Sequence, residues 1–469
     1  MHVINHRQHG TYISGQRSRK KLTLQITGAI AGVFVLANIV MFALYFNKAL
    51  PHYSVGFQAI GGKNYDEIDG ILQSKMLPDG VTLSKAETKQ SIPVSDLGIS
   101  VDRDKTMQAV KSKPLVPLIS LVKHHTVPLV LTSDLAKVTA ALVKYDATFS
   151  KAPTDKHIGF NGTTFEVQKA EAGYTFDEDK TANNLIMAIA DGKDTMQAVV
   201  TKQPAGSNDA DLSSQLTTLQ KQLQTKITLN YQSQKAEPSA AEIGSWYVRS
   251  GTSMAPSAER IGAYIDSSSQ KFGVTAANRS DLVTAITYVL SKNISSNFRI
   301  SATGNSTVRT YCTNVNGMPT SELGDLIGKL AATYADTRGW NDNGAIAFKH
   351  VESGCGYTVV LAASSRMTSY GAICDNYYNC QIGANVIVNG DRWLYATDPW
   401  NKTGQSVEAY RQLIINHETG HRLGFRDNNV CSGPGQPAPV MSQQSIDLLG
   451  CVFNVWPLQS ELDNLKSML

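Results

Sequence analysis

An uncharged and mostly apolar stretch runs from Leu24 to Phe46, near the start of this 469-residue chain. Only Gln25, Thr27, Asn38 and small residues interrupt it. About 20 such residues cross the hydrocarbon core of a bilayer as a helix, which pairs every backbone polar group internally. The sequence therefore predicts a transmembrane helix over residues 23–47, and the rest of the chain must fold in domains attached to it.

The residues before this stretch fix the expected orientation. Residues 1–22 contain basic side chains and no acidic ones: Arg7, Arg17, Arg19, Lys20 and Lys21. By the positive-inside rule this segment is a cytoplasmic basic tail, and the C-terminal domains are extracellular or wall-facing at the cell membrane. A cleaved signal peptide is the alternative, but its apolar core of about 7–15 residues would be shorter and would end in an A-x-A-like site.

Composition excludes two classes of protein. Hydrophobic residues make up 42%, charged residues 17%, and the net charge is +4. A disordered chain would contain fewer apolar residues, and a nucleic-acid-binding domain would have a larger basic excess. We therefore expect a multidomain α+β protein with no nucleic-acid partner.

All cysteines lie in the last third of the chain, at Cys312, Cys355, Cys374, Cys380, Cys431 and Cys451. An even number in an extracellular region predicts up to three disulfides, and about 15 pairings are possible. Proximity in sequence favours Cys374 with Cys380 and Cys431 with Cys451, which leaves Cys312 for Cys355.

An internal repeat follows the apolar stretch. The segment Leu97–Thr106 aligns with Ala172–Thr181, at an offset of 173 − 98 = 75 residues. Each copy predicts a short strand, a turn and an amphipathic helix, with Asp104 or Asp179 placed to cap the helix. We expect two small α+β modules, at residues 53–130 and 131–205.

The pattern of a strand, Gly-x-x-x-Asp-x-Asp and a helix resembles the peptidoglycan-binding modules that precede some L,D-transpeptidases and vancomycin-resistance-related proteins. The resemblance implies peptidoglycan as a partner. The aspartates themselves are more simply explained as helix caps than as ligand-binding groups. After the polar linker Ala205–Asp211, residues 212–303 predict a mixed α+β adaptor domain with no chemical constellation.

The C-terminal domain, residues 305–469, contains every cysteine and four of the five tryptophans. We expect a helix at 322–336, strands near 346–350, 357–363 and 384–389, and a helix at 407–424 that Ser406 caps. These elements predict helices packed on a small sheet.

The last of these helices contains the sequence His417-Glu418-Thr419-Gly420-His421. Residues four apart share a helix face, so both imidazoles can bind one zinc ion while Glu418 serves as general base. Gly424 can stop the helix and return Asp427 as a third ligand. A turn at Pro439-Val440-Met441 would then place Met441 beneath the metal in a structural role.

Several further motifs occur in the order of a known family. They are Arg338-Gly339-Trp340, Cys374 and Cys380 before Gln381-Ile382-Gly383, Arg392-Trp393-Leu394, the run 415–424, the run 431–444, Cys451 and Trp456-Pro457. Residues 305–460 resemble an actinobacterial family of secreted or anchored zinc peptidases that is largely uncharacterised, with a metzincin-like HExxHxxGxx[H/D] site and methionine turn. The family has a third histidine where this chain has Asp427. Zinc also accepts carboxylate oxygen, so ligation is expected. In the alternative, Asp427 only caps a turn and water is the third ligand.

These features predict a membrane-anchored zinc metallopeptidase that hydrolyses peptide or protein substrates with a zinc-bound water activated by Glu418. One alternative is a cell-wall-binding surface protein whose peptidase domain has lost activity. Another is an L,D-transpeptidase, since Ser353-Gly354-Cys355 resembles the nucleophile motif of those enzymes. The expected disulfide at Cys355 and the absence of a following arginine argue against it.

Overall fold

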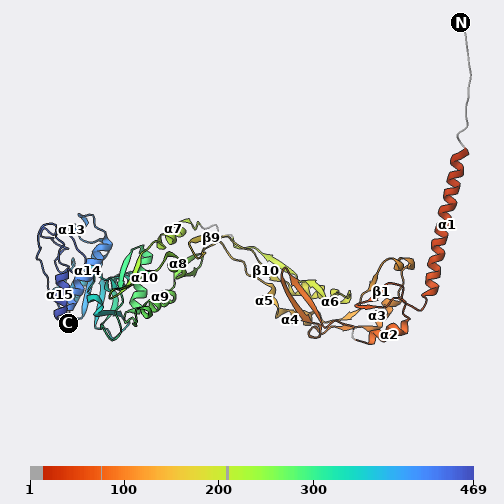
Figure 1. Cartoon of the computed structure of the whole chain (residues 1–469), viewed down its shortest axis with the longest axis horizontal. Helices are drawn as coiled ribbons and strands as arrows, with labels where there is room; N and C mark the ends of the chain where they lie inside the picture. Colours follow the sequence, from red (N-terminus) through yellow and green to blue (C-terminus); the bar gives the residue numbers. More distant parts are fainter. Residues whose placement is uncertain (1–13, 75, 207–210, 469) are drawn as a thin grey trace, which may run out of the picture. The chain divides into compact units, whose positions relative to one another are not determined.

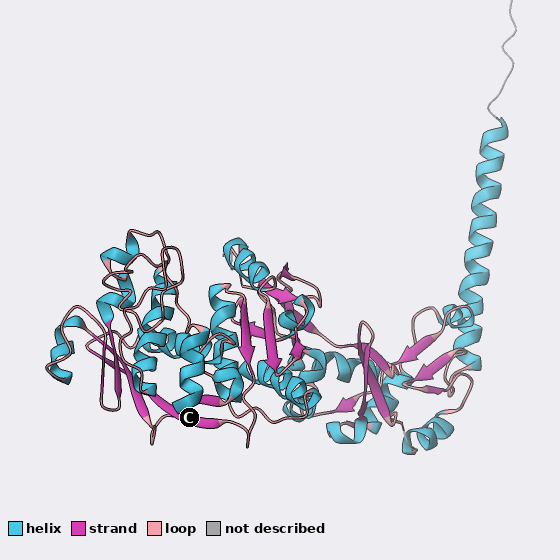
Figure 2. Ribbon diagram, turned by 60° about the vertical axis from the view of Figure 1, so that its left-hand side comes forward, coloured by secondary structure: helices cyan, strands magenta, loops and turns pink. Residues whose placement is uncertain are grey.

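The computed structural model describes residues 14–74, 76–206 and 211–468. The chain forms two compact units, one of residues 1–154 and 170–207 and the other of residues 155–169 and 208–469. Both units mix helices with strands, as the α+β prediction requires (Figure 2). The boundaries of these units differ from those of the predicted domains, because residues 155–169, which we predicted in the second module, pack into the core of the second unit.

Helix α1 (Ser14–Leu44) contains the predicted span, and its segment Gln25–Leu44 is long and apolar enough to cross a membrane. Most side chains of this segment are exposed, as expected for a surface that faces lipid. Of the basic tail predicted for residues 1–22, residues 1–13 lie outside the described part of the chain. A terminal apolar helix together with disulfides is typical of a secreted or membrane-anchored protein.

The first unit contains two three-stranded sheets with the same strand order. Its segments are coloured from red to yellow-green in Figure 1. In each sheet, the first strand pairs antiparallel with the second and parallel with the third. The first sheet consists of β1 (Tyr53–Val55), β2 (Gln58–Ala59) and β6 (His125–Val127). The second consists of β3 (Gly80–Lys85), β4 (Thr88–Pro93) and β11 (Thr195–Gln197). Apolar side chains of two helices pack on each sheet: α2 (Tyr65–Gln73) and α3 (Arg103–Lys111), and α4 (Leu135–Val143) and α6 (Glu178–Ala190). A short helix α5 (Asp146–Phe149) and the strand pairs β5 (Ser100–Val101) with β7 (Leu131–Thr132) and β10 (Gly173–Phe176) with β12 (Val200–Gln203) complete the unit.

The two copies of the repeat are not consecutive in space. The hairpin β3–β4 lies within residues 53–130, which we predicted as the first module, but β3 pairs with β11 of the second. Its Val81 and Leu83 accordingly belong to the core that contains Leu185. Repetition in the sequence locates the two strand–helix motifs, but it does not show which hairpin packs with each motif.

The helix caps fall two residues before the predicted positions. The side chain of Asp102 accepts a hydrogen bond from the Lys105 amide at 3.0 Å, and that of Asp177 accepts one from the Lys180 amide at 2.9 Å. Asp104 and Asp179, which we expected to be the caps, lie in the first turn of their helices. The helices start earlier because the preceding strands end directly at the first aspartate of each pair.

One threonine in each copy joins its helix to the residue that directly precedes a strand. The Thr106 hydroxyl accepts a hydrogen bond from the Val130 amide, and the Thr181 hydroxyl accepts one from the Val199 amide, both at 3.0 Å. Both threonines are fully buried. These equivalent bonds explain why the sequence repeat continues to the threonine.

The second unit begins with a third sheet of the same strand order, in the region that we predicted as a mixed α+β adaptor. It consists of β13 (Ile227–Tyr231), β14 (Gln234–Ala236) and β17 (Ser296–Arg299). The hairpin of β8 (His157–Phe160) and β9 (Phe165–Gln168), which lies within the range predicted for the second module, packs into this core. The remaining elements are α7 (Ser213–Gln222), α8 (Ala240–Ser245), β15 (Tyr247–Ser250), β16 (Ser253–Pro256), α9 (Ala258–Lys271) and α10 (Arg279–Lys292).

A five-stranded sheet of order β19-β18-β20-β22-β21 forms the centre of the C-terminal region. Its strands are β18 (Thr307–Asn316), β19 (Ile346–His350), β20 (Tyr357–Ala362), β21 (Cys380–Ile382) and β22 (Asn385–Asn389), all parallel except β21 at one edge. Helices α11 (Ser321–Ala335) and α14 (Val407–Leu423) share one apolar core with this sheet. The shorter helices are α12 (Gly390–Tyr395), α13 (Asp398–Asn401) and α15 (Gln459–Met468).

Three disulfides brace this region: Cys312–Cys355, Cys374–Cys380 and Cys431–Cys451. They are the pairings that proximity in sequence favours. Because Cys355 is bonded to Cys312, it is not a thiol nucleophile, which removes the basis of the L,D-transpeptidase interpretation.

The buried threonine bonds provide a test of the repeat. Thr181→Val keeps the volume of the side chain but leaves the Val199 amide without its acceptor, at an expected cost of about 1–3 kcal/mol. Native-state hydrogen exchange of the full chain should show faster exchange at Val199. The exposed Thr132→Val is the matched control, with an effect within about 0.5 kcal/mol. Equal protection of Val199 in both variants would refute this role of Thr181.

Candidate metal centre

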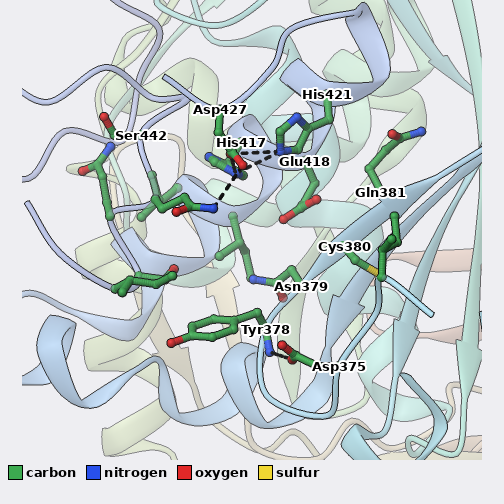
Figure 3. Close-up of a pocket in the computed structure, with 17 residues that line it drawn as sticks. Asp375, Tyr378, Asn379, Cys380, Gln381, His417, Glu418, His421, Asp427 and Ser442 are labelled. Atoms are coloured by element: carbon green, nitrogen blue, oxygen red, sulfur yellow. Dashed lines mark hydrogen bonds and ion pairs between the residues drawn. The ribbon is translucent and has the colours of Figure 1, made fainter. Parts of the chain in front are cut away.

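Helix α14 positions the three residues of the HExxH motif that we expected to act at a metal. Its first turn is capped by Ser406, whose hydroxyl accepts a hydrogen bond from the Ala409 amide at 3.1 Å. It ends at Gly424, whose φ of 106° is a left-handed conformation that suits glycine. The chain then turns back, and Asp427 comes to lie beside His417 and His421 (Figure 3).

Three potential ligand atoms converge at one point. The Nε2 atoms of His417 and His421 are 3.2 Å apart, and each lies 3.4 Å from Oδ1 of Asp427. Tetrahedral zinc with ligands at about 2.0–2.1 Å requires ligand atoms about 3.3–3.4 Å apart. The triangle of the three atoms therefore fits zinc.

The other ring nitrogens show which atoms are free to bind. Nδ1 of His417 donates a hydrogen bond to the Val440 carbonyl at 2.9 Å, and Nδ1 of His421 donates one to the Phe425 carbonyl at 3.0 Å. In a neutral imidazole the proton is then on Nδ1, so both Nε2 atoms present lone pairs. Two lone pairs and a carboxylate oxygen in contact repel one another unless a cation lies between them. The hydrogen bonds thus prepare the site for a metal.

The charges of the ligands follow from the same contacts. When His417 is protonated, its Nε2–H donates to Asp427 and lowers the pKa of that carboxyl below its usual value, and burial opposes this effect only in part. Asp427 is therefore a carboxylate, the form that binds a metal. Burial lowers the pKa of His417, but its contacts with Asp427 and Glu418 raise it more, so a metal would have to displace this proton. Burial lowers the pKa of His421, which favours its neutral, ligand form.

Glu418 is buried next to the ligands, with an exposed fraction of 4%. Its Oε2 atom has no hydrogen-bond partner among the described residues. Burial raises the pKa of this carboxyl to about 7; the charge of Asp427 adds to the increase and that of His417 opposes it. A carboxyl that is poised near neutrality and has a free oxygen is suited to accept and return a proton.

Met441 packs against Gly420 of α14. A Cβ atom on Gly420 would lie 2.2 Å from Sδ of Met441 and 3.1 Å from the ring of Trp340. Only glycine therefore allows this close approach of turn and helix. The Trp340 indole N–H donates to the Asn416 carbonyl at 2.8 Å and fixes the same face.

Glu461 was not predicted as part of the site. Its buried carboxylate accepts hydrogen bonds from the Val440 and Met441 amides, at 3.0 and 2.9 Å. It therefore holds the turn whose Val440 carbonyl orients His417. The only signal in the sequence is an acidic residue at the start of an amphipathic helix, which is common at helix N-termini.

Gln443 was also missed. Its side-chain amide donates to Oδ2 of Asp427 at 3.0 Å and leaves Oδ1 directed at the histidines. Asn416, which precedes His417 on α14, donates its side-chain amide to the Val455 carbonyl at 2.7 Å. It joins α14 to the C-terminal segment.

The site opens into a cleft of about 410 Å³. Leu413 and Ile414 of α14, the loop closed by Cys374–Cys380, and residues 442–446 line it (Figure 3). Its walls contain both polar and apolar side chains. The cleft is large enough for a few residues of an extended polypeptide.

Comparison with known families supports part of the sequence interpretation. Residues 90–197 match a family described as "Putative peptidoglycan binding domain". Residues 316–455 match a family described as "Protein of unknown function (DUF3152)". No curated protein and no solved structure matches the chain. The peptidoglycan-binding resemblance is thus confirmed for residues 90–197, whereas no protease family is found and the peptidase assignment stays a prediction.

The contact between Gly420 and Met441 can be tested by overpacking. Gly420→Ala forces Met441 and Trp340 apart and should destabilise the second unit by about 1–3 kcal/mol. Gly324→Ala is the matched control, because Gly324 is exposed in α11 with open space at its Cβ position, and alanine there stabilises a helix by up to about 1 kcal/mol. Calorimetry of the full chain should show opposite shifts of the transition. A shift of the same sign would mean that the turn does not require glycine.

Proposed function

We propose that this chain is a membrane-anchored, wall-facing hydrolase that uses zinc to cleave peptide bonds. The observation that supports it best is the triangle of His417 Nε2, His421 Nε2 and Asp427 Oδ1, with separations of 3.2–3.4 Å, beside the buried Glu418. This combination supplies ligands and a base to the same small space.

Each residue has a defined task in this proposal. His417, His421 and Asp427 hold the zinc ion, and the Nδ1 hydrogen bonds keep both histidines in the binding tautomer. Zinc supplies a Lewis acid that ionises water near neutral pH and polarises a carbonyl group. Glu418 accepts a proton from the attacking water through its free oxygen and delivers it to the amine that leaves.

The location follows from the other parts of the chain. The apolar segment of α1 anchors the protein, and the disulfides favour an extracellular C-terminal region. The module matched by the peptidoglycan-binding family would hold the chain near the cell wall. Peptides or proteins exposed at this surface are the expected substrates.

A second candidate function is wall binding without catalysis. The match over residues 90–197 supports it directly, and the aspartate in place of a third histidine is what a degenerate site could contain. The two candidates differ in whether the full chain hydrolyses peptides when zinc is bound.

Replacement of the base distinguishes them. Glu418→Gln keeps the shape of the side chain and should retain about one zinc per chain, while peptide-library cleavage falls about 100- to 10,000-fold through loss of the base. Metal content and cleavage are measured on the same sample, and the exposed Glu352→Gln is the control with unchanged activity. A wild-type chain that binds zinc and cleaves nothing would favour the wall-binding function.

The third ligand is tested by zinc affinity. Gln443→Leu releases Oδ2 of Asp427, and loss of such a supporting bond costs about 10- to 100-fold in affinity. Asp427→Asn removes the ligand charge itself and should cost more. Competition with a chromophoric chelator measures both, with the exposed Gln436→Leu as control. Unchanged affinity in Asp427→Asn would support water as the third ligand.

A further inference from the structure

We propose that residues 114–122 enter the outer leaflet of the membrane beside α1 and give the protein a second contact with lipid. This inference rests on the proposed anchoring of the chain by α1. It concerns a segment of the first unit, remote in sequence from the metal site.

Exposed apolar side chains mark the segment. Leu115 and Val122 have exposed fractions of 94% and 89%, and they are the two most exposed large apolar side chains in the described part of the chain. Ile119 between them is 53% exposed. Such a cluster on a protein surface marks a contact with a partner or with lipid.

A hydrogen bond fixes the depth of the segment. The Leu118 amide donates to Oδ1 of Asn38 at 3.2 Å, and the Asn38 side-chain amide donates to the Phe34 carbonyl at 2.8 Å. Asn38 precedes Leu44, the end of the apolar span, by six residues, which is about 9 Å along a helix. If the span fills the apolar layer, Leu118 lies below its outer boundary.

The conclusion also holds if the membrane span begins and ends earlier in the sequence. Only residues 22–37 separate Lys21 from Asn38, and these 16 residues cover about 24 Å of helix. The apolar core of a bilayer is about 30 Å thick. The helix therefore cannot span the core and leave Asn38 outside it.

The backbone of the segment is suited to a medium without water. Pro114 and Pro117 have no N–H group to satisfy. The residues from Pro117 to Leu121 form a short 3-10 helix, and the Val122 amide donates to the Ile119 carbonyl at 3.1 Å. Internal bonds of this kind are what lipid requires of a peptide chain.

Cationic side chains surround the segment. Lys113 donates to the Tyr45 and Phe46 carbonyls, where α1 ends, and Lys123 follows Val122. Residues 105–133 contain four lysines and no acidic residue. A hollow of about 770 Å³ lies between Lys113, Leu115, Ile119 and Lys123. It is complementary to an anionic phospholipid, because its lysines suit the headgroup and its apolar side chains suit an acyl chain.

The test places a fluorescent probe at single introduced cysteines in the full chain. The six native cysteines are paired in disulfides and do not react. Leu115→Cys and Val122→Cys report on the segment, Val33→Cys on the span, and Met187→Cys, 65% exposed on α6, on a surface in water. Each variant is labelled with an environment-sensitive dye and reconstituted in phosphatidylcholine–phosphatidylglycerol nanodiscs, in which both faces are open to solvent.

Probes at 115 and 122 should be quenched by spin-labelled lipid and protected from aqueous iodide several-fold relative to position 187. Lipid contact at 33 with iodide access at 115 and 122 would overturn the inference and leave the anchor intact. Iodide access at 33 would refute the anchor and the inference together. The dye occupies positions that are already exposed, so the fold tolerates it.

Discussion

The hydrogen bond between Nδ1 of His417 and the Val440 carbonyl is the contact on which the candidate metal centre depends. It fixes the proton on the nitrogen that faces away from the site, and so leaves Nε2 as a ligand. The position of Val440 depends in turn on Glu461, which holds the amides of Val440 and Met441. The geometry of the ligands is thus set by residues that never touch the metal position, as is usual around metal-binding histidines.

Helix α10, which precedes the C-terminal region, supports helix α14. The Tyr288 hydroxyl of α10 donates to Glu408 in the first turn of α14 at 2.7 Å, and the buried Lys329 of α11 pairs with Glu408 at 2.8 Å. Asp281 of α10 accepts hydrogen bonds from Tyr311 at 2.8 Å and from the His350 amide at 3.1 Å. Removal of one partner from such a buried network leaves an uncompensated charge. The boundary predicted near residue 304 therefore falls within one cooperative body, and residues 305–469 alone would lack part of their support.

Local chemistry explains what the sequence predicted well. The cap at Ser406, the glycine stop at Gly424 and the shared face of His417 and His421 each depend on neighbours within a few residues. Disulfide pairing between cysteines close in sequence is local in the same sense. Strand β18 was missed because its residues Thr307–Asn316 are mostly polar, although it lies in the middle of the sheet.

Features that depend on distant pairing were not predictable in this way. Nothing near β3 shows that its parallel partner is β11, more than a hundred residues later. The third sheet shares the strand order of the first two, yet no repeated motif marks it in the sequence. Glu461 and Gln443 act through contacts made only after the chain has folded, so their residue types alone gave no indication of their role.

Asp427 is the residue on which catalytic and degenerate interpretations differ most. Each of the three candidate ligands has its second polar atom engaged: His417 with Val440, His421 with Phe425, and Asp427 with Gln443. Val440 and Gln443 belong to the same turn, so one turn orients two ligands of different chemistry. The Gln443 amide has both a donor and an acceptor, and it uses the donor on Oδ2 of the Asp427 carboxylate. With Oδ2 held by Gln443, Oδ1 faces the Nε2 atoms of both histidines at 3.4 Å, and this arrangement favours a metal centre built around a carboxylate.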